Sequence, residues 1–218
     1  MTIGKLTSAI DKLKPLSQPP RLYIGASIIG SSCMRQIWYA YQGKKTEPPI
    51  SRHQRNLDIG NKFEGMVLDW LQDANVKVVR PNSTNNYLAY TDKELPYFKG
   101  HADALLPDLN AIIDIKVIKS SSYNEFVRKG LKVWSQLYYA QLQAYMGMAN
   151  FPHAYLLALN KDSGELHDEQ VEFNADYYKA LKNRAKLVHR ASSAPPKVSN
   201  NPAWYICKMC RYNKLCHA

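Results

Sequence analysis

The sequence predicts an α/β domain in which helices flank a group of β-strands. Two observations support this class. Apolar residues recur at helical spacing in some segments and alternate or run continuously in others, and the two kinds of segment follow one another along the chain. The 218 residues suffice for one domain, or for one domain with a small attached lobe. No apolar run approaches the roughly 20 residues that cross a membrane, so we expect no membrane partner.

Turn-forming residues divide the chain into elements. Residues 1–20 predict a short helix and a Pro-rich connector, and further helices are expected over Tyr23–Tyr41, Asp58–Asp73, Trp134–Met148 and Asn174–Ala191. The expected strands are Val76–Arg80, Tyr87–Tyr90, Tyr97–Leu106, Ala111–Ile118, Ala154–Leu159 and Glu165–Phe173. The Pro-containing segments Thr46–Ser51 and Pro81–Asn86 are expected to be a loop and a turn.

The charge balance favours a polyanionic partner. Lys and Arg number 29 against 18 Asp and Glu, a net charge of +11. Nucleic acid is the first interpretation and an anionic membrane the second, while the alternative is a charge that merely keeps the protein soluble. The N-terminus has no continuous apolar stretch typical of a signal peptide, and we expect a cytoplasmic protein in a bacterial, archaeal or phage-infected cell.

A predicted hairpin is the most informative segment. Pro-Asp-Leu-Asn at 107–110 is turn chemistry between two β-rich runs, so Leu106 is expected to face Ala111. The same register places Asp103 directly opposite Asp114. Side chains on paired strands that face each other in this way lie close together.

Facing carboxylates repel unless something compensates, and a divalent cation between Asp103 and Asp114 would do so. Carboxylates with an open, water-bearing position suit Mg²⁺ or Mn²⁺, which polarises a phosphate and activates a bound water. Lys116 shares the face of Asp114, beside the expected scissile phosphate. The alternative is a surface hairpin with solvated charges. The apolar neighbours Ile113 and Ile115 favour a buried strand, where unpaired charges are costly.

These residues resemble the core of the PD-(D/E)XK nuclease superfamily: Gly100-His101-Ala102-Asp103, a ten-residue gap, then Asp114-Ile115-Lys116. The resemblance implies a restriction-endonuclease-like core, with a central mixed sheet flanked by helices. It also implies a metal held by the two aspartates and by the backbone carbonyl of Ile115. Lys116 would then steer or deprotonate water and stabilise the phosphate in the transition state.

A further segment resembles the RecB-type branch of that superfamily. Gly60-Asn61-Lys62-Phe63-Glu64 is similar to its first motif, a glycine followed four residues later by His or an acidic residue. Glu64 lies at the border of the apolar stripe of its predicted helix, so its carboxylate could add a third metal ligand. The alternative is an ordinary flanking glutamate.

Gln141-Leu142-Gln143-Ala144-Tyr145 resembles the Gln-x-x-x-Tyr motif of the same branch. Gln141 falls in the centre of an apolar helix face, where it must find hydrogen-bond partners. The resemblance implies that Gln141 points to the active site and orients water or DNA phosphate, with Tyr145 beside it. The alternative is a core glutamine satisfied by the backbone.

The cysteines form a second signal, with one near the N-terminus and three close together at the C-terminus: Cys33, Cys207, Cys210 and Cys216. In a cytosolic chain metal binding is favoured over disulfides. Four thiolates can bind Zn²⁺ or a [4Fe–4S] cluster, and their spacing does not separate the two.

The cysteine pattern resembles the iron–sulfur nucleases of the RecB branch, most closely the fourth CRISPR-associated protein family and its phage relatives, over roughly residues 25–216. It implies a structural [4Fe–4S] cluster, with Zn²⁺ as the alternative. We expect an N-terminal helical region over 1–57, a nuclease core over 58–191 and a C-terminal cysteine segment over 192–218 that packs with the N-terminal region.

The expected function is a Mg²⁺- or Mn²⁺-dependent DNA exonuclease for single-stranded or end-frayed DNA in recombination, repair or CRISPR-type processing. Homo-oligomers and recombination or CRISPR proteins are the expected protein partners. We also expect the basic helix Lys179–Arg190 to track the DNA backbone, and Tyr138 and Tyr139 to stack bases. The alternatives are a non-catalytic DNA-binding or adaptor module on a nuclease fold, and a zinc-stabilised RNA-binding protein.

Overall fold

The structure is a computed structural model that describes residues 4–13, 20–46, 51–81 and 88–218. Its elements in chain order are α1 (Lys5–Asp11), β1 (Ile24–Gly25), α2 (Ala26–Ile29), α3 (Met34–Tyr41), α4 (Ser51–Asp73), β2 (Ala89–Thr91), β3 (Phe98–His101), β4 (Ala104–Leu106), the 3₁₀ helix η1 (Pro107–Leu109), β5 (Ala111–Ile118), α5 (Ser120–Lys129), α6 (Leu131–Trp134), α7 (Gln136–Ala149), β6 (His153–Asn160), β7 (Leu166–Glu172), α8 (Ala175–Arg190), α9 (Tyr205–Lys208) and α10 (Asn213–His217). None of these described helices is long and apolar enough to span a bilayer.

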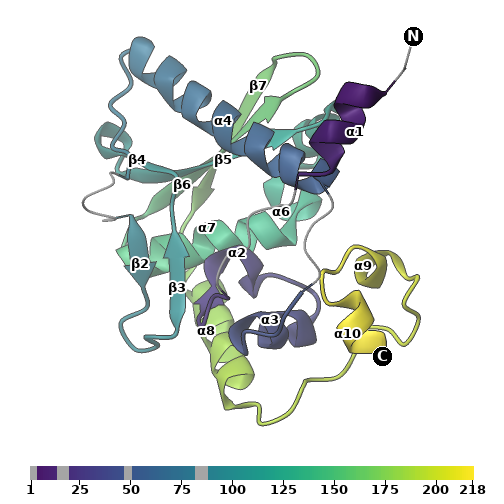
Figure 1. The fold of residues 1–218 in the computed structure, drawn as a ribbon. Helices are drawn as coiled ribbons and strands as arrows, with labels where there is room; N and C mark the ends of the chain where they lie inside the picture. Colours follow the sequence, from purple (N-terminus) through teal and green to yellow (C-terminus); the bar gives the residue numbers. More distant parts are fainter. Residues whose placement is uncertain (1–3, 14–19, 47–50, 82–87) are drawn as a thin grey trace.

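Two sheets form from the described strands (Figure 1). The larger has the order β4-β5-β6-β7, with β5 and β6 parallel and the other pairs antiparallel. The smaller has the order β1-β3-β2, with β1 parallel to β3. Helix α4 covers one face of the larger sheet and α7 the other, so β5 is buried on both faces, as its nearly continuous apolar sequence requires.

The predicted α/β class is confirmed, and the second half of the chain follows the predicted elements closely. Strand β5 has the predicted bounds, and β6, β7 and α8 end within one residue of theirs. Most of the predicted loop at 46–51, the turn at 81–86 and the connector within 1–20 lie outside the described residues, as does Tyr87 of a predicted strand.

The single strand predicted over Tyr97–Leu106 is wrong. The segment forms β3 and β4, which belong to different sheets and are separated by Ala102 and Asp103. The Asp103 carboxylate accepts the backbone N–H of Ile115 at 2.7 Å. The Asp103 carboxylate thus takes the place of a backbone carbonyl as the partner of the Ile115 N–H, at the point where the chain passes from one sheet to the other. The strand predicted over 76–80 is also wrong, since only Val79 bridges to a strand.

Several helices have other bounds than predicted. The helix predicted over Tyr23–Tyr41 is divided into β1, α2 and α3, and the one predicted over Trp134–Met148 is interrupted at Ser135. The Ser135 hydroxyl accepts the Tyr138 N–H at 3.3 Å and so caps α7. Helix α4 begins seven residues before its predicted start, at Ser51, and α5 was not predicted at all.

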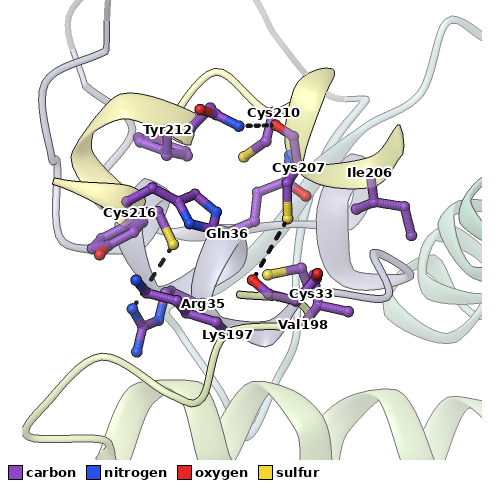
Figure 2. Close-up of a pocket in the computed structure, with 14 residues that line it drawn as sticks. Cys33, Arg35, Gln36, Lys197, Val198, Ile206, Cys207, Cys210, Tyr212 and Cys216 are labelled. Atoms are coloured by element: carbon purple, nitrogen blue, oxygen red, sulfur yellow. Dashed lines mark hydrogen bonds between the residues drawn. The ribbon is translucent and has the colours of Figure 1, made fainter. Parts of the chain in front are cut away.

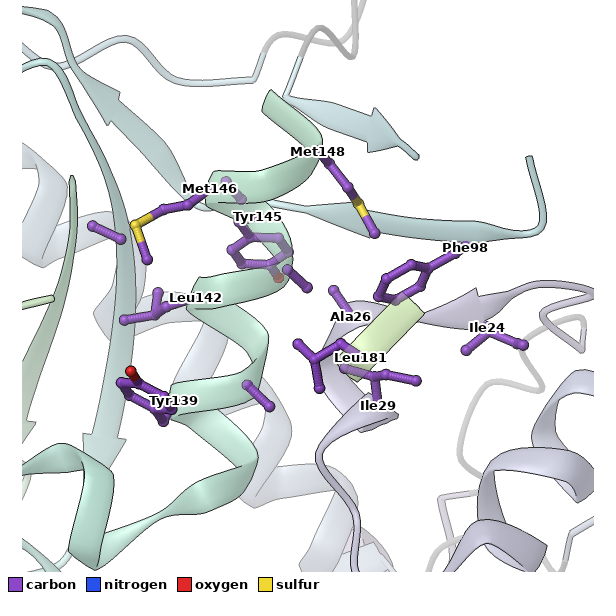
Figure 3. Packing of buried hydrophobic residues seen from close by; sticks show 14 of the residues in the cluster. Ile24, Ala26, Ile29, Phe98, Tyr139, Leu142, Tyr145, Met146, Met148 and Leu181 are labelled. Carbon is purple, nitrogen blue, oxygen red and sulfur yellow. The ribbon is translucent and has the colours of Figure 1, made fainter. Parts of the chain in front are cut away.

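Helix α7 lies at the centre of the larger hydrophobic core (Figure 3). Leu142 and Met146 extend from one side of α7, while Ala26 lies beyond the other side. Gly100 of β3 permits this close packing. A Cβ atom there would lie 2.6 Å from Cε1 of Tyr145 and 2.8 Å from Cβ of Ala26. The absence of a side chain on β3 therefore fixes how closely the smaller sheet approaches α7.

Replacement of Gly100 by alanine should destabilise the fold, because its methyl group would overlap the Tyr145 ring. We expect Gly100→Ala to lower the free energy of unfolding by about 1–3 kcal/mol. Gly60→Ala is the matched control, since a Cβ on Gly60 in α4 meets nothing within 4 Å. That substitution should raise the free energy of unfolding by about 0.5–1 kcal/mol through helix propensity. Urea unfolding measures both, and equal effects of the two variants would contradict the packing described.

Candidate active site

The predicted hairpin register is confirmed. Leu106 pairs with Ala111 and Ala104 with Ile113, so Asp103, one residue before β4, comes opposite Asp114 of β5. The Asp114 side chain belongs to the face of β5 that α7 covers and is only 1% exposed. A carboxylate buried to this degree requires partners that replace water.

Two groups contact the Asp114 carboxylate. Its Oδ1 accepts a hydrogen bond from Nε2 of Gln141 at 2.8 Å, and its Oδ2 forms an ion pair with the Lys116 ammonium. Oδ2 accepts no hydrogen bond of good geometry from the described residues. Nε2 of Gln141 also donates to the Tyr145 hydroxyl at 2.7 Å. Helix α7 therefore presents both residues of the Gln-x-x-x-Tyr segment to the carboxylate.

Lys116 is held in its charged form. Burial would lower the pKa of its ammonium, but the negative charges of Asp114 and Asp103 outweigh burial and raise that pKa above the ordinary value. The ammonium also lies 3.3 Å from the carbonyl oxygen of Ile115 and 5.1 Å from the centre of the Tyr138 ring. At neutral pH the site therefore contains a fixed positive charge beside its carboxylates.

Asp103 and Glu64 complete an acidic cluster. Burial, reinforced by the charge of Asp114, raises the pKa of Asp103 well above its usual range. Burial also raises the pKa of Glu64. The positive charge of Lys116 lowers this pKa in part, and the negative charge of Asp114 raises it further. Glu64 of α4 thus lies within electrostatic reach of residues on β5. An added cation would stabilise the ionised form of all these carboxylates.

A divalent metal fits the donor chemistry of this cluster. The described residues include no ready-made group of three or more His, Cys, Asp or Glu side chains that could hold a metal ion. However, among the described residues the Lys116 ammonium forms an ion pair with the buried Oδ2 of Asp114, which accepts no well-aligned hydrogen bond, and the Ile115 carbonyl lies 3.3 Å from the same ammonium. Carboxylate and carbonyl oxygens are the ligands that Mg²⁺ and Mn²⁺ prefer.

The sequence did not predict that Arg21 and Lys99 lie near His101, or that Arg21 lies near Tyr145. Burial, and then the charges of Arg21 and Lys99, lower the pKa of His101, and Arg21 also acts on the pKa of Tyr145. The parallel pairing of Gly25 with Lys99 brings these segments together. The sequence carried no signal for it, because a two-residue strand inside a predicted helix has no periodicity.

The base contact expected of Tyr139 is wrong, and part of the basic helix expected to follow DNA is engaged within the chain. Tyr139 is 8% exposed, so its ring cannot stack on a base. On α8, Lys182 forms an ion pair with Glu94 at 2.6 Å, and Arg184 donates to the Ser31 carbonyl. Lys182 and Arg184 therefore hold parts of the chain together, while a contact of Lys179, Lys186 and Arg190 with a DNA backbone stays a prediction.

All four cysteines line one cavity between α3 and the C-terminal segment (Figure 2). Burial, and then the charges of Cys33 and Cys216, raise the pKa of the Cys207 thiol. Nη1 of Arg35 lies 3.8 Å from Sγ of Cys216. In the described part of the chain the thiols form no ready-made metal-binding group, although their number and shared cavity match the donor set of Zn²⁺ or an iron–sulfur cluster.

The C-terminal segment packs on α3. Nε1 of Trp38 donates to the Ala191 carbonyl at 2.9 Å, and Nε of Arg35 donates to the Pro195 carbonyl at 2.5 Å. The rings of Tyr39 and Tyr212 lie 5.4 Å apart. These contacts hold the three C-terminal cysteines next to Cys33 by means of ordinary side chains.

Solved structures resemble this fold at low sequence identity. An alkaline exonuclease from Laribacter hongkongensis, in complex with dAMP, has a TM-score of 0.61 and 13% identity, over 78% of this chain and 87% of its own. SSO0001 has a TM-score of 0.60 and 18% identity, over 98% of this chain and 96% of its own. A phage-related exonuclease from Haemophilus somnus 129PT has a TM-score of 0.58 and 12% identity, over 77% of this chain and 92% of its own.

No protein-family model and no curated protein matches the chain. The structural likeness establishes that the chain shares the fold of these structures, a mixed sheet flanked by helices. The SSO0001 match extends over nearly the whole chain and so includes the segment that carries the C-terminal cysteines.

Removal of the Asp103 charge should make the metal-free protein more stable than the wild type, and this difference in unfolding free energy should grow as the pH rises. The ordinary pKa of an aspartate is about 3.9, and burial beside Asp114 raises it in the folded state. Below the ordinary value the carboxyl is protonated in both states and carries no penalty. As the pH rises toward the folded-state pKa, the unfolded chain loses its proton first, so folding stability falls.

We therefore expect Asp103→Asn to exceed the wild type in unfolding free energy by about 1–2 kcal/mol at pH 8 and by less at pH 4.5. Urea unfolding with a chelator present measures the difference. An advantage that shrinks between pH 4.5 and pH 8 would contradict the assigned electrostatics.

Proposed function

We propose that this chain is a metal-dependent nuclease that hydrolyses phosphodiester bonds in DNA from free ends. One observation carries the proposal: the buried Asp114 carboxylate is contacted by Lys116 and Gln141, with Asp103 opposite it. A buried acidic cluster with a fixed ammonium group is costly for stability, which favours a functional role. The named exonucleases among the structural neighbours support the same class of reaction.

In this proposal the oxygen ligands of Mg²⁺ or Mn²⁺ come from Asp103, Asp114, Glu64 and the Ile115 carbonyl. The bound metal would polarise the phosphate and lower the pKa of a coordinated water. Lys116 keeps its proton at neutral pH, which favours electrostatic stabilisation of the developing phosphate charge over proton abstraction.

Gln141 is assigned a positioning role. Its amide holds Oδ1 of Asp114 at 2.8 Å and the Tyr145 hydroxyl at 2.7 Å, so the carboxylate cannot rotate freely. Burial raises the pKa of Tyr145 well above its usual value. Tyr145 therefore stays protonated, and its hydroxyl, which accepts from Gln141, keeps its own proton to donate within the site.

DNA is the proposed substrate for two reasons. The net charge of +11 favours a polyanion, and one structural neighbour is an exonuclease in complex with dAMP. Single-stranded or end-frayed DNA is the proposed form, processed in recombination, repair or CRISPR-type pathways. A non-catalytic DNA-binding module is the alternative, and the assay below separates the two.

We also propose that the four cysteines bind a structural [4Fe–4S] cluster, with Zn²⁺ as the alternative occupant. The shared cavity and the packing of the C-terminal segment on α3 support this. Residues 58–191 would then form the nuclease core, and residues 1–57 and 192–218 a lobe held by the cysteines. The cluster would stabilise this lobe and take no part in hydrolysis.

Loss of the Asp114 charge should abolish cleavage. With end-labelled oligonucleotides, one end blocked, and Mn²⁺ present or absent, the wild type should release nucleotides from a free end only when metal is present. Asp114→Asn should lower the rate at least about a hundredfold. Asp108→Asn is the matched control, because that carboxylate is exposed on the hairpin turn and should leave the rate unchanged. Wild-type activity in the Asp114 variant would refute the assignment.

Loss of one cysteine should release the bound metal. After anaerobic purification we expect absorption near ~400 nm with iron and sulfide for a cluster, or stoichiometric zinc for the alternative. Cys207→Ser should lose this metal and lower the melting temperature. Met209→Ser, an exposed position between two cysteines, should retain it. Wild-type protein that binds neither metal would contradict this proposal.

A further inference from the structure

We propose that a polar groove next to the candidate active site binds the backbone of the DNA strand that is being cut. The groove has a volume of about 280 Å³. It lies where the N-terminal half of α4 meets the end of β5 and the start of α5. Its walls include Asn56, Ile59, Val117, Ile118, Lys119 and Lys161. The proposal rests on the proposed nuclease function, which defines the strand that enters the groove.

The groove and the site share two elements, and their residues lie close together along both. Lys119 follows Lys116 by three residues, about 10 Å at the rise of a strand. Ile59 precedes Glu64 by five residues, about 7.5 Å at the rise of a helix. Both separations are short enough for one DNA strand to reach from the site into the groove.

Two ammonium groups give the groove its charge. Lys119 and Lys161 are exposed, and neither forms an ion pair with another described residue. The Lys161 N–H donates to the Ile118 carbonyl at 2.9 Å, which fixes both lysines at the same edge of the sheet. The neighbouring carboxylate of Asp162 accepts the backbone N–H of Ser120 at 2.8 Å and its hydroxyl at 3.1 Å. Asp162 is thus held in place by Ser120, and its charge also acts on both lysines, so the three side chains together leave the groove a net positive charge.

The other walls suit the remainder of a nucleotide. Ile59 is 40% exposed, and Val117 and Ile118 are half-buried, so they provide an apolar surface beside the two cations. A DNA strand presents phosphates that lysines bind without regard to sequence, and sugars and bases that pack on apolar side chains. The groove therefore fits a strand read by its backbone, independent of base sequence.

The test measures how the binding of single-stranded DNA depends on salt. Binding of a fluorescent oligonucleotide is followed by anisotropy with Mg²⁺ present, in the Asp114→Asn background so that the DNA stays intact. Lys119→Gln with Lys161→Gln removes two charges from the groove. Lys93→Gln with Lys208→Gln removes two exposed charges elsewhere and is the matched control.

Each lysine–phosphate contact contributes about 0.7 to the slope of log K against log salt for a single strand. The groove variant should therefore lower the magnitude of the slope by about 1.4, while the control leaves it unchanged. An unchanged slope in the groove variant, or an equal fall in both variants, would overturn the groove. Circular dichroism melts establish that both variants are folded.

The nuclease assay decides the proposed function separately. If the wild type cleaves no DNA with any metal, the nuclease proposal fails, while the slope comparison still decides whether the groove binds DNA. If the wild type cleaves and the slopes of the two variants match, the groove alone is refuted.

Discussion

The neutralisation of one buried carboxylate organises the centre of this molecule. A charge such as that of Asp114 in a strand covered on both faces would cost several kcal/mol without partners. Its partners come from two elements: the ammonium of Lys116 from β5 itself and the amide of Gln141 from α7. Helix α7 must therefore cross the sheet at the position along β5 where Gln141 reaches Asp114. Gly100 permits the contact that holds it there, because β3 can approach Tyr145 closely.

The same cluster creates a conflict between stability and chemistry. The pKa values of Asp103 and Glu64 are raised because Lys116 and, for Asp103, the Ile115 N–H offset only part of the effect of burial and of the neighbouring charges. An added cation would lower these pKa values and stabilise the ionised carboxylates. At functional sites such local destabilisation is common, and the packing of the surrounding core offsets its cost in folding free energy. Here the stabilising contribution comes from the buried apolar residues of α7 and of both faces of the larger sheet.

The cysteine-containing lobe is connected to the core through α3. Trp38 and Arg35 of this helix bind the chain just after α8, and Tyr39 contacts the ring of Tyr212. The lobe thus has polar and aromatic contacts of its own besides the cavity that the cysteines share. The similarity to SSO0001 extends over 98% of this chain, whereas the two exonuclease neighbours match 77–78% of it.

Local patterns in the sequence were sufficient for the hairpin and for the strands and helix that follow it. Turn chemistry and side-chain alternation act over a few residues, so they determine that Asp103 faces Asp114 and that Lys116 lies on the same face. Spacing by four residues likewise places Gln141 and Tyr145 on one side of a helix. These features need no knowledge of the remainder of the chain.

Tertiary structure alone decided where the strand from Tyr97 divides, why Tyr139 is buried, and how Arg21 comes to lie near His101. It also formed the groove between α4 and the end of β5. Each of these features depends on contacts between segments distant in sequence. The free energy of such contacts comes from packing and pairing that leave no periodic trace in either segment.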